Sequence, residues 1–205
     1  MNVGIFGGTF DPPHNGHMSL ALSIIENTDI DRIVFVLSAA PPHKPGQPIS
    51  SFYNRMNMLN LAIHGTGVFS SSDMEYKRLP KLSYMYDTML ELESAFSRDT
   101  IVLIIGEDSL DQLYLWYKGR EIAEKWKILT YPRQGEKVTI KSLKKNWTQE
   151  MSEKLLKTIV QTAVFPVSAT NIRERIISKE NINNLVKPGV LNYINKNKLY
   201  RKEVK

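Results

Sequence analysis

Hydrophobic residues alternate along the chain between short continuous runs and longer segments with helical spacing. The short runs predict buried strands at residues 2–6, 33–37, 101–105, 127–130 and 163–167. Between them, apolar residues recur three and four positions apart. This spacing predicts helices that begin near Asn15 and that cover residues 55–63, 84–92, 122–126, 150–162 and 171–178.

Strands that alternate with helices indicate a parallel sheet, because each parallel return needs a covering crossover. We therefore expect an α/β fold: a Rossmann-like parallel sheet with helices on both faces. Ligands of such sheets bind beyond the carboxyl ends of the strands, so the loops after Phe6, Leu37, Ile105 and Val167 should converge. With 205 residues and no linker-like segment, the chain predicts a single domain over 1–205.

Composition and charge narrow the class of protein. The chain has no cysteine, so neither disulfides, thiolate metal sites nor a sulfur nucleophile are expected. No apolar run reaches the roughly 18 residues that span a bilayer, and no export signal precedes one, so we expect a cytoplasmic protein without a membrane partner. The net charge is +6. Much of it comes from lysines spaced as on a solvated helix face rather than a nucleic-acid surface: Lys141, Lys144, Lys145, Lys154 and Lys157.

The first loop has the composition of a phosphate-binding turn. Gly7 and Gly8 follow the first strand directly, with Thr9 and Phe10 next, and a helix begins a few residues later. Backbone N–H groups can approach an anion there, and the helix start adds unpaired donors and partial positive charge. The loop matches neither the Walker P-loop nor the dinucleotide fingerprint.

His14 and His17 lie three positions apart at the start of this helix, so they share one face. Two imidazole donors aimed at one phosphate suit charge stabilisation. A structural pair or a zinc site is the alternative, although zinc requires more ligands than His43 and His64 readily supply. We expect no protein metal site.

The segment from Gly7 to His17 resembles the nucleotidyltransferase superfamily that carries a His-x-x-His motif. A second element of that superfamily resembles residues 167–173, where Ser168 or Thr170 would cap a helix and Arg173 would lie in its first turn. A cation at a helix start can hold the phosphate tail of ATP. Alone, this stretch reads equally well as an ordinary capped helix with a solvated arginine.

Within the superfamily, the chain resembles bacterial nicotinate-nucleotide adenylyltransferases from Met1 to about Tyr200. Further segments carry this resemblance: Pro41-Pro42-His43-Lys44-Pro45, Glu75-Tyr76-Lys77-Arg78 with Ser83-Tyr84, Ile104-Ile105-Gly106-Glu107-Asp108 through Trp116-Tyr117, and Tyr193-Ile194 with Leu199-Tyr200.

The resemblance implies transfer of the adenylyl group of ATP to nicotinate mononucleotide, with pyrophosphate and nicotinate adenine dinucleotide (deamido-NAD) as products of NAD biosynthesis. The dinucleotide would be a product, not a cofactor, and Mg²⁺ would accompany ATP. His14, His17 and Arg173 would be catalytic. The ATP site would comprise Gly7, Gly8, Thr9, Phe10, His14, His17, Gly106, Asp108, Ser168, Thr170, Ile172 and Arg173.

The same resemblance places the nicotinate ring against Trp116, next to Tyr117, with its carboxylate at backbone groups near Tyr84 and Trp116. Lys44 would contact phosphate, or simply be solvated. An apolar helix face shared with Leu113 is the alternative for the aromatic pair. The family usually has threonine where this chain has Met85, so a side-chain contact near the nicotinate is lost and the preference for the acid over the amide substrate becomes an open question.

Two other functions remain open at this point. The acceptor could be the amide mononucleotide or phosphopantetheine. Alternatively, the fold could be a catalytically idle nucleotide-binding or RNA-binding module, although a pure binder would not need the paired imidazoles. We expect no nucleic-acid partner; formation of a homo-oligomer is left open.

Overall fold

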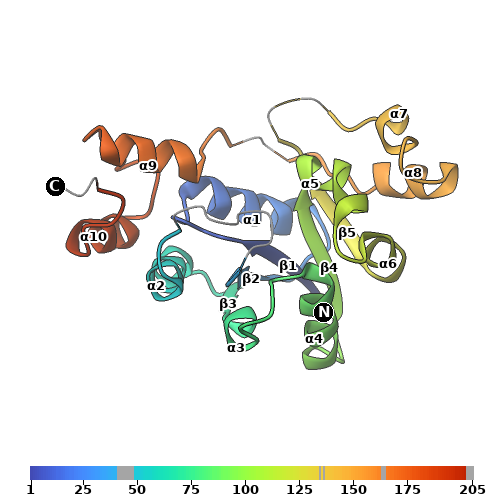
Figure 1. The fold of residues 1–205 in the computed structure, drawn as a ribbon, viewed down its shortest axis with the longest axis horizontal. Helices are drawn as coiled ribbons and strands as arrows, with labels where there is room; N and C mark the ends of the chain where they lie inside the picture. The colour runs from blue at the N-terminus through green and yellow to red at the C-terminus, as the bar shows by residue number, and fades with distance from the viewer. Residues whose placement is uncertain (41–48, 134, 136, 163–164, 202–205) are drawn as a thin grey trace.

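The computed structural model describes residues 1–40, 49–133, 135, 137–162 and 165–201 (Figure 1). Within these residues, one parallel sheet has the strand order β3-β2-β1-β4-β5. The strands are β1 (Asn2–Gly8), β2 (Arg32–Leu37), β3 (Phe69–Ser72), β4 (Thr100–Gly106) and β5 (Lys127–Tyr131). The predicted α/β fold with a parallel sheet is confirmed.

Helices cover both faces of this sheet (Figure 1). One core cluster joins the sheet to α1 (Asn15–Asn27), α2 (Phe52–Ile63), α9 (Ala169–Ile177) and α10 (Pro188–Lys196). The other joins it to α4 (Met85–Ala95), α5 (Glu107–Asp111), α6 (Gly119–Lys125) and α8 (Gln149–Leu156). Successive strand residues point to opposite faces, so Phe6 belongs to the first cluster and Ile5 to the second. The short elements are α3 (Met74–Lys77), the 3-10 turn Leu113–Leu115 and α7 (Ile140–Leu143).

The predicted strand at residues 163–167 was wrong where it can be compared. Residues 165–167 belong to no strand, and 163–164 lie outside the described residues. The free edge of β5 is bonded instead by the segment after α8: Thr130 donates its N–H to the Thr158 carbonyl at 2.9 Å, and Val160 donates to the Thr130 carbonyl at 2.9 Å. Pro166 has no N–H to give to a ladder, which explains why the segment remains a loop.

Three further elements differ from the predictions. The helix predicted at residues 150–162 ends at Leu156, because the β-branched run Thr158-Ile159-Val160 prefers extended backbone. A helical turn, α7, begins at Ile140, where no element was predicted. Strand β3 was missed because its sequence, FSSS, is short and polar, as edge strands often are.

The strand order reverses between β1 and β4. After β3, at one edge, the chain returns to pair β4 with the other side of β1, in a register that sets Phe6 opposite Ile104. In open parallel sheets, ligands bind at such a switch point, beyond the carboxyl ends of the strands. Gly7-Gly8 and Gly106 end β1 and β4 there.

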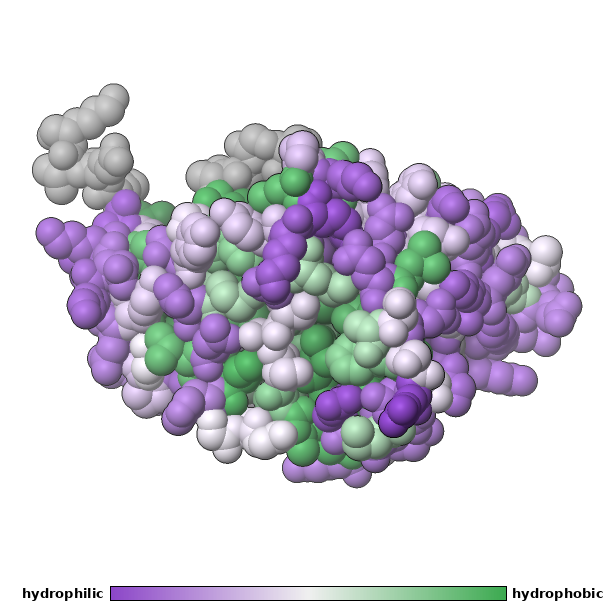
Figure 2. Space-filling model, turned by 90° about the horizontal axis from the view of Figure 1, so that it is seen from below, coloured by the Kyte–Doolittle hydropathy of each residue, from purple (hydrophilic) through white to green (hydrophobic). Residues whose placement is uncertain are grey.

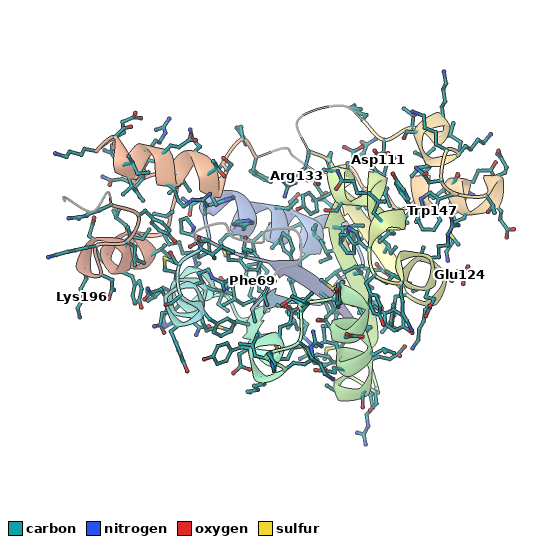
Figure 3. The ribbon with its side chains drawn as sticks, viewed as in Figure 1. Phe69, Asp111, Glu124, Arg133, Trp147 and Lys196 are labelled. Atoms are coloured by element: carbon teal, nitrogen blue, oxygen red, sulfur yellow. The ribbon has the colours of Figure 1, made fainter. Side chains whose placement is uncertain are left out.

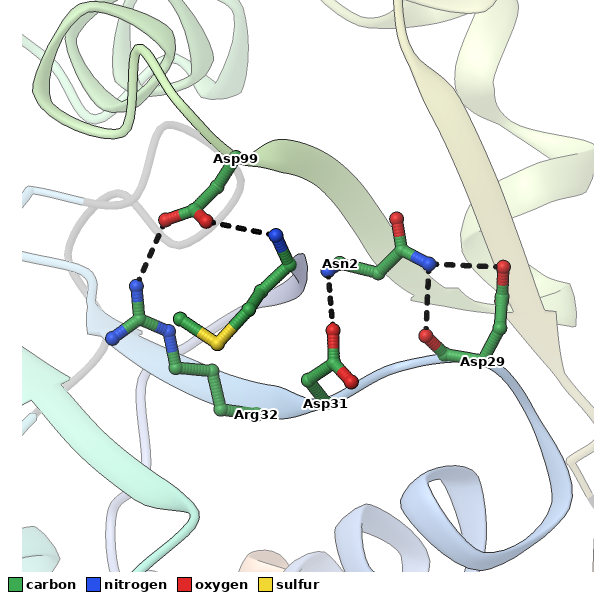
Figure 4. Close-up of polar contacts among 6 residues, drawn as sticks. Asn2, Asp29, Asp31, Arg32 and Asp99 are labelled. Carbon is green, nitrogen blue, oxygen red and sulfur yellow. Dashed lines mark hydrogen bonds and ion pairs between the residues drawn. The ribbon is translucent and has the colours of Figure 1, made fainter.

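The amino ends of the strands are held together by polar contacts (Figure 4). The Asn2 backbone N–H donates to Asp31 at 2.6 Å, and its side chain donates to Asp29 at 3.0 Å. Asp99 accepts from both the Met1 amino group and Arg32, each at 3.0 Å. These contacts hold β1, β2 and β4 together at their amino ends, opposite the switch point at their carboxyl ends.

The lysines of residues 141–157 are exposed, as predicted for a solvated helix face. Hydrophilic side chains gather at the end of the molecule where α7 and α8 lie (Figure 2). In the described part of the chain, no helix is both long and apolar enough to cross a membrane.

Candidate active site

A cavity of about 630 Å³ lies at the switch point. It is bounded by the loop after β1, the start of α1, the end of β5 and the segment that leads into α9. The two motifs at opposite ends of the sequence therefore meet here. The expected ATP-binding residues that line the cavity are Gly7, Gly8, Thr9, Phe10, His14, His17, Ser168, Thr170 and Arg173.

The two histidines cap α1 reciprocally. The His17 backbone N–H donates to Nδ1 of His14 at 3.3 Å, and the His14 backbone N–H donates to Nδ1 of His17 at 3.2 Å. The rings stack with their centroids 3.6 Å apart and an angle of 22° between their planes. Because each Nδ1 accepts a hydrogen bond, the proton of each neutral ring resides on Nε2. The pair therefore offers two Nε2–H donors.

Burial keeps both rings uncharged. It lowers the pKa of His14 to about 4, with a further contribution from the positive charge of Arg133. The pKa of His17 also lies well below its ordinary value, because of burial first, then His14 and Arg133. At neutral pH, the pair is therefore uncharged and can offer an anion hydrogen bonds rather than positive charge.

Acidification should therefore destabilise the fold before the carboxylates titrate. With a pKa of 6.5 in the unfolded chain and about 4 in the folded protein, His14 contributes stability that is complete above 6.5 and lost as the pH falls toward 4. Linkage gives a loss of about 2 kcal/mol from His14 alone between about pH 7 and about pH 5. Urea unfolding at several pH values measures this slope. It should flatten in His14→Gln and persist in the exposed control His64→Gln; an equal slope in both variants would contradict the account.

Phe10 shapes the loop between β1 and the histidines. Its φ is +44°, which is uncommon for a residue other than glycine, and its ring is buried. The ring lies edge-on to His17 at 5.0 Å and to Phe6 at 5.9 Å. Packing thus holds a backbone conformation that is otherwise unfavourable, and it fixes the position of the His17 imidazole.

The helix start of α9 forms as the sequence predicted. Ser168, not Thr170, is the N-cap, and its hydroxyl accepts the Asn171 N–H at 3.1 Å. Arg173 donates to the Thr170 hydroxyl at 3.2 Å and to the Asp11 carbonyl at 2.7 Å. Ile172 is different, because its side chain is buried in the first core cluster and does not line the cavity.

Arg133 lines the cavity and was missed from the sequence (Figure 3). Its guanidinium lies 3.4 Å from Asp108 and donates to the Tyr131 hydroxyl at 3.1 Å. Asp108 and Gly106 do not line the cavity themselves. A Cβ on Gly106 would come within 2.5 Å of Asp108 Oδ1 and 2.9 Å of Arg133 Nε, so glycine allows this ion pair to form. The sequence did indicate this position, because Arg133 lies two residues beyond the carboxyl end of β5, where ligands of such sheets bind.

The residues expected to bind nicotinate lie outside this cavity. The Tyr84 and Tyr117 rings are 4.7 Å apart, while Trp116 is half-buried against the second core cluster, together with Leu113. That packing agrees with the apolar alternative for Trp116. The Met85 side chain reaches Gly7, where an added Cβ would lie 2.5 Å from its terminal methyl.

Met85, next to Tyr84, therefore packs against the loop after β1 at Gly7. Lys44 and the rest of the segment 41–45 lie outside the described residues.

A second group of buried polar residues, also not predicted from the sequence, packs against the loop that follows β1. The Arg55 guanidinium is 2% exposed and donates to three backbone carbonyls: Ser50 at 2.9 Å, Thr9 at 2.9 Å and Ser38 at 2.8 Å. Asp11 is 4% exposed and lies close enough to interact with the Arg55 charge. A buried cation thus fastens the loops that follow β1 and β2 to one another.

The side chains around the cavity do not resemble a metal centre. Among the described residues, no three His, Cys, Asp or Glu side chains converge as metal ligands would. Each Nδ1 of the histidine pair is already used in capping the helix. The donors around the cavity are mostly N–H groups and guanidinium groups, which bind phosphate oxygens rather than metals.

Comparison with known proteins agrees with this geometry. A family model described as cytidylyltransferase-like matches residues 5–175. A nicotinate-nucleotide adenylyltransferase of Bacillus subtilis is 34% identical over 198 residues, which are 97% of each chain. Two structures of a Plasmodium falciparum nicotinic acid mononucleotide adenylyltransferase, complexed with NaAD and with APC, share the fold at 19% identity. The alignments cover 97% of this chain and 97% and 96% of those chains, with TM-scores of 0.74 and 0.72. The chain belongs to the nicotinate-nucleotide adenylyltransferase family of cytidylyltransferase-like proteins.

Proposed function

We propose that this protein transfers the adenylyl group of ATP to nicotinate mononucleotide and releases pyrophosphate. One observation carries the proposal: the paired histidines and the capped start of α9 line one cavity at the switch point of the sheet. ATP would lie in this cavity, and the acceptor nucleotide would lie beyond Gly7, near Tyr84 and Tyr117.

The reaction needs no covalent enzyme intermediate. A phosphate oxygen of the mononucleotide attacks the α-phosphorus, the new P–O bond forms, and the bond to the bridging oxygen of the β-phosphate breaks. The attacking oxygen is already deprotonated, so no base is required. His14 and His17 would donate Nε2–H bonds to the α-phosphate as charge develops on its oxygens.

Cationic side chains would bind the leaving pyrophosphate. Arg173 is the fifth residue of α9, close to the helix start, whose unpaired N–H groups and partial positive charge attract anions. Arg133 faces the same cavity from the end of β5 and is half-exposed, so it can turn from Asp108 toward phosphate. Asp108 would then be released toward a ribose hydroxyl or a metal-bound water.

Mg²⁺ fits this site as a companion of ATP rather than as a resident of the protein. Since the described residues converge on no three-ligand cluster, the triphosphate oxygens themselves would supply most of its ligands. Bound in that way, Mg²⁺ neutralises charge on the phosphates.

The acid form of the acceptor fits the start of α4. The N-cap, Tyr84, makes no side-chain cap, so the first N–H groups of the helix can receive a carboxylate. Backbone N–H groups can bind a carboxylate there whichever side chain position 85 carries. The neutral amide would gain less from the helix start, and aromatic rings at Tyr84, Trp116 and Tyr117 would border the pyridine ring.

Placing threonine at position 85 should increase the preference for the acid over the amide substrate. In Met85→Thr, one added hydroxyl donor near the carboxylate is expected to raise the ratio of kcat/KM for the acid over the amide substrate about threefold to tenfold. Steady-state kinetics with both acceptors measure the ratio. Leu90→Thr, on an exposed position of the same helix, is the matched control and should leave it unchanged. A ratio that falls in Met85→Thr would contradict a carboxylate at this helix start.

Product analysis tests the function itself. The protein is incubated with ATP, Mg²⁺ and, in separate reactions, nicotinate mononucleotide, the amide mononucleotide or phosphopantetheine, and products are separated by chromatography. The proposal predicts one dinucleotide and one pyrophosphate per ATP consumed, fastest with nicotinate mononucleotide. Phosphopantetheine as the preferred acceptor would reassign the substrate, and RNA retention without turnover would favour a binding module.

The remaining expectations stay proposals. We propose a single nucleotidyltransferase domain over residues 1–205, acting in the cytoplasm on small-molecule substrates, without a nucleic-acid or membrane partner. Size-exclusion chromatography with light scattering decides whether a homo-oligomer forms.

A further inference from the structure

Tyr200 connects the C-terminal segment to the phosphate-binding loop. Its hydroxyl donates to Oδ1 of Asp11 at 2.6 Å, across 189 positions of sequence. Tyr200 follows α10 and has a φ of +62°, so tertiary contacts hold its backbone in an uncommon conformation. Burial, and then the Asp11 carboxylate, raise its pKa far above the ordinary value, so the hydroxyl remains a donor at every physiological pH.

Asp11 lies in the loop after β1, on one side of the proposed ATP site, and in turn contacts helix α9 on the other side. Its Oδ2 accepts the Ser50 N–H at 3.2 Å, and its backbone carbonyl accepts from Arg173 at 2.7 Å. Asp11 is 4% exposed and lies three residues before His14. Any movement of Asp11 therefore shifts the histidine pair and the guanidinium of Arg173 together.

We propose that Tyr200 is a positioning residue for adenylyl transfer, which acts through Asp11 on the placement of His14, His17 and Arg173. The inference rests on the proposed function for its kinetic consequence, although the positioning itself can be measured without a reaction. Tyr200 does not line the cavity, so it is not expected to touch either substrate.

The test compares Tyr200→Phe with Tyr193→Phe in the full chain. Tyr193 lies on α10, where its hydroxyl donates to Asn54 and accepts from Asn57, each at 3.0 Å. Its replacement removes the same hydroxyl from the same C-terminal segment without a direct contact to the loop. Urea unfolding reports the stability of both variants, and two further measurements report positioning.

The first is amide hydrogen exchange of the peptide covering residues 9–18 in the ligand-free protein. We expect exchange at least about tenfold faster in Tyr200→Phe and unchanged in Tyr193→Phe, because local opening of the loop no longer has to break the bond to Asp11. Similar exchange in both variants and the wild type would overturn the positioning role, whether or not nicotinate mononucleotide is the acceptor.

The second measurement is the kinetics of dinucleotide formation. Small misplacements of reacting groups lower turnover strongly, so kcat should fall about tenfold or more in Tyr200→Phe, with KM for ATP changed less than about threefold. Tyr193→Phe should keep the wild-type kcat. Equal loss of kcat in the two variants would mean a general structural effect and would also overturn the inference. A wild-type protein that fails to react, while the exchange difference is present, would count against the proposed acceptor and support the positioning role.

Discussion

Replacing His17 with glutamine is expected to lower kcat for adenylyl transfer about 10²–10³-fold, or roughly 3 to 4 kcal/mol of transition-state stabilisation. The reason is the loss of a neutral Nε2–H donor that burial and helix capping hold in place. Glutamine is chosen because it is favoured at the third position of a helix, where its side chain can still accept the N-cap N–H. The fold should therefore survive while the imidazole donor is lost. Pre-steady-state rates of pyrophosphate release measure the effect.

Two other variants separate chemistry from folding. His17→Ala removes both the donor and half of the reciprocal cap, so it should lose activity and about 1 kcal/mol of stability as well. His64→Gln changes an exposed histidine at the end of α2 and should be silent. Activity within a few-fold of wild type in His17→Gln would contradict the role of the histidine pair.

Replacing Arg55 with leucine is expected to lower the free energy of unfolding by about 3–5 kcal/mol. The substitution removes the donor that the carbonyls of Ser50, Thr9 and Ser38 share in a buried site, and it removes the buried positive charge that interacts with Asp11. Each unsatisfied buried acceptor costs about 1–3 kcal/mol, although relaxation and water entry recover part of the sum. Denaturation in urea measures the loss.

Two arginine controls accompany this measurement. Arg175→Leu removes an exposed guanidinium whose ion pair with Glu180 spans 3.9 Å, and it should cost less than about 1 kcal/mol. Arg55→Lys keeps the charge and loses the planar fork, so its stability should lie between those of wild type and Arg55→Leu. A loss in Arg55→Leu as small as that in Arg175→Leu would mean that Arg55 does not fasten the two loops.

Most strands of the sheet and the loop after β1 were readable from the sequence because their signals are local. Continuous apolar runs that end at glycine predicted β1 and β4. The loop after β1 and the segment before α9 meet at the cavity as predicted, whereas the loop after β4 does not line it. His14 and His17 followed from spacing alone, since residues three apart at a helix start share a face. The α9 motif followed because a cap and its helix are adjacent in sequence.

Other features depend on contacts that only the fold creates. Arg55 lies in an amphipathic helix, and nothing in its local sequence indicates burial, yet the fold surrounds it with carbonyls from two loops, those after β1 and β2. Asp11 reads as a turn residue before proline, although its partner Tyr200 comes from the far end of the chain. The prediction of a strand at residues 163–167 was wrong for the same reason. The open edge of β5 is bonded by a different segment, Thr158–Val160. The sequence alone does not show which of two short apolar runs pairs with an open edge.

The rate of pyrophosphate release from ATP and Mg²⁺, measured with each mononucleotide in turn, decides whether this protein transfers the adenylyl group to the acid mononucleotide. With a carboxylate bound at the start of α4, kcat/KM for nicotinate mononucleotide should exceed that for the amide form by about tenfold or more, since the neutral amide would gain less from the helix start. An equal or reversed preference, or no release with either mononucleotide, would contradict this account.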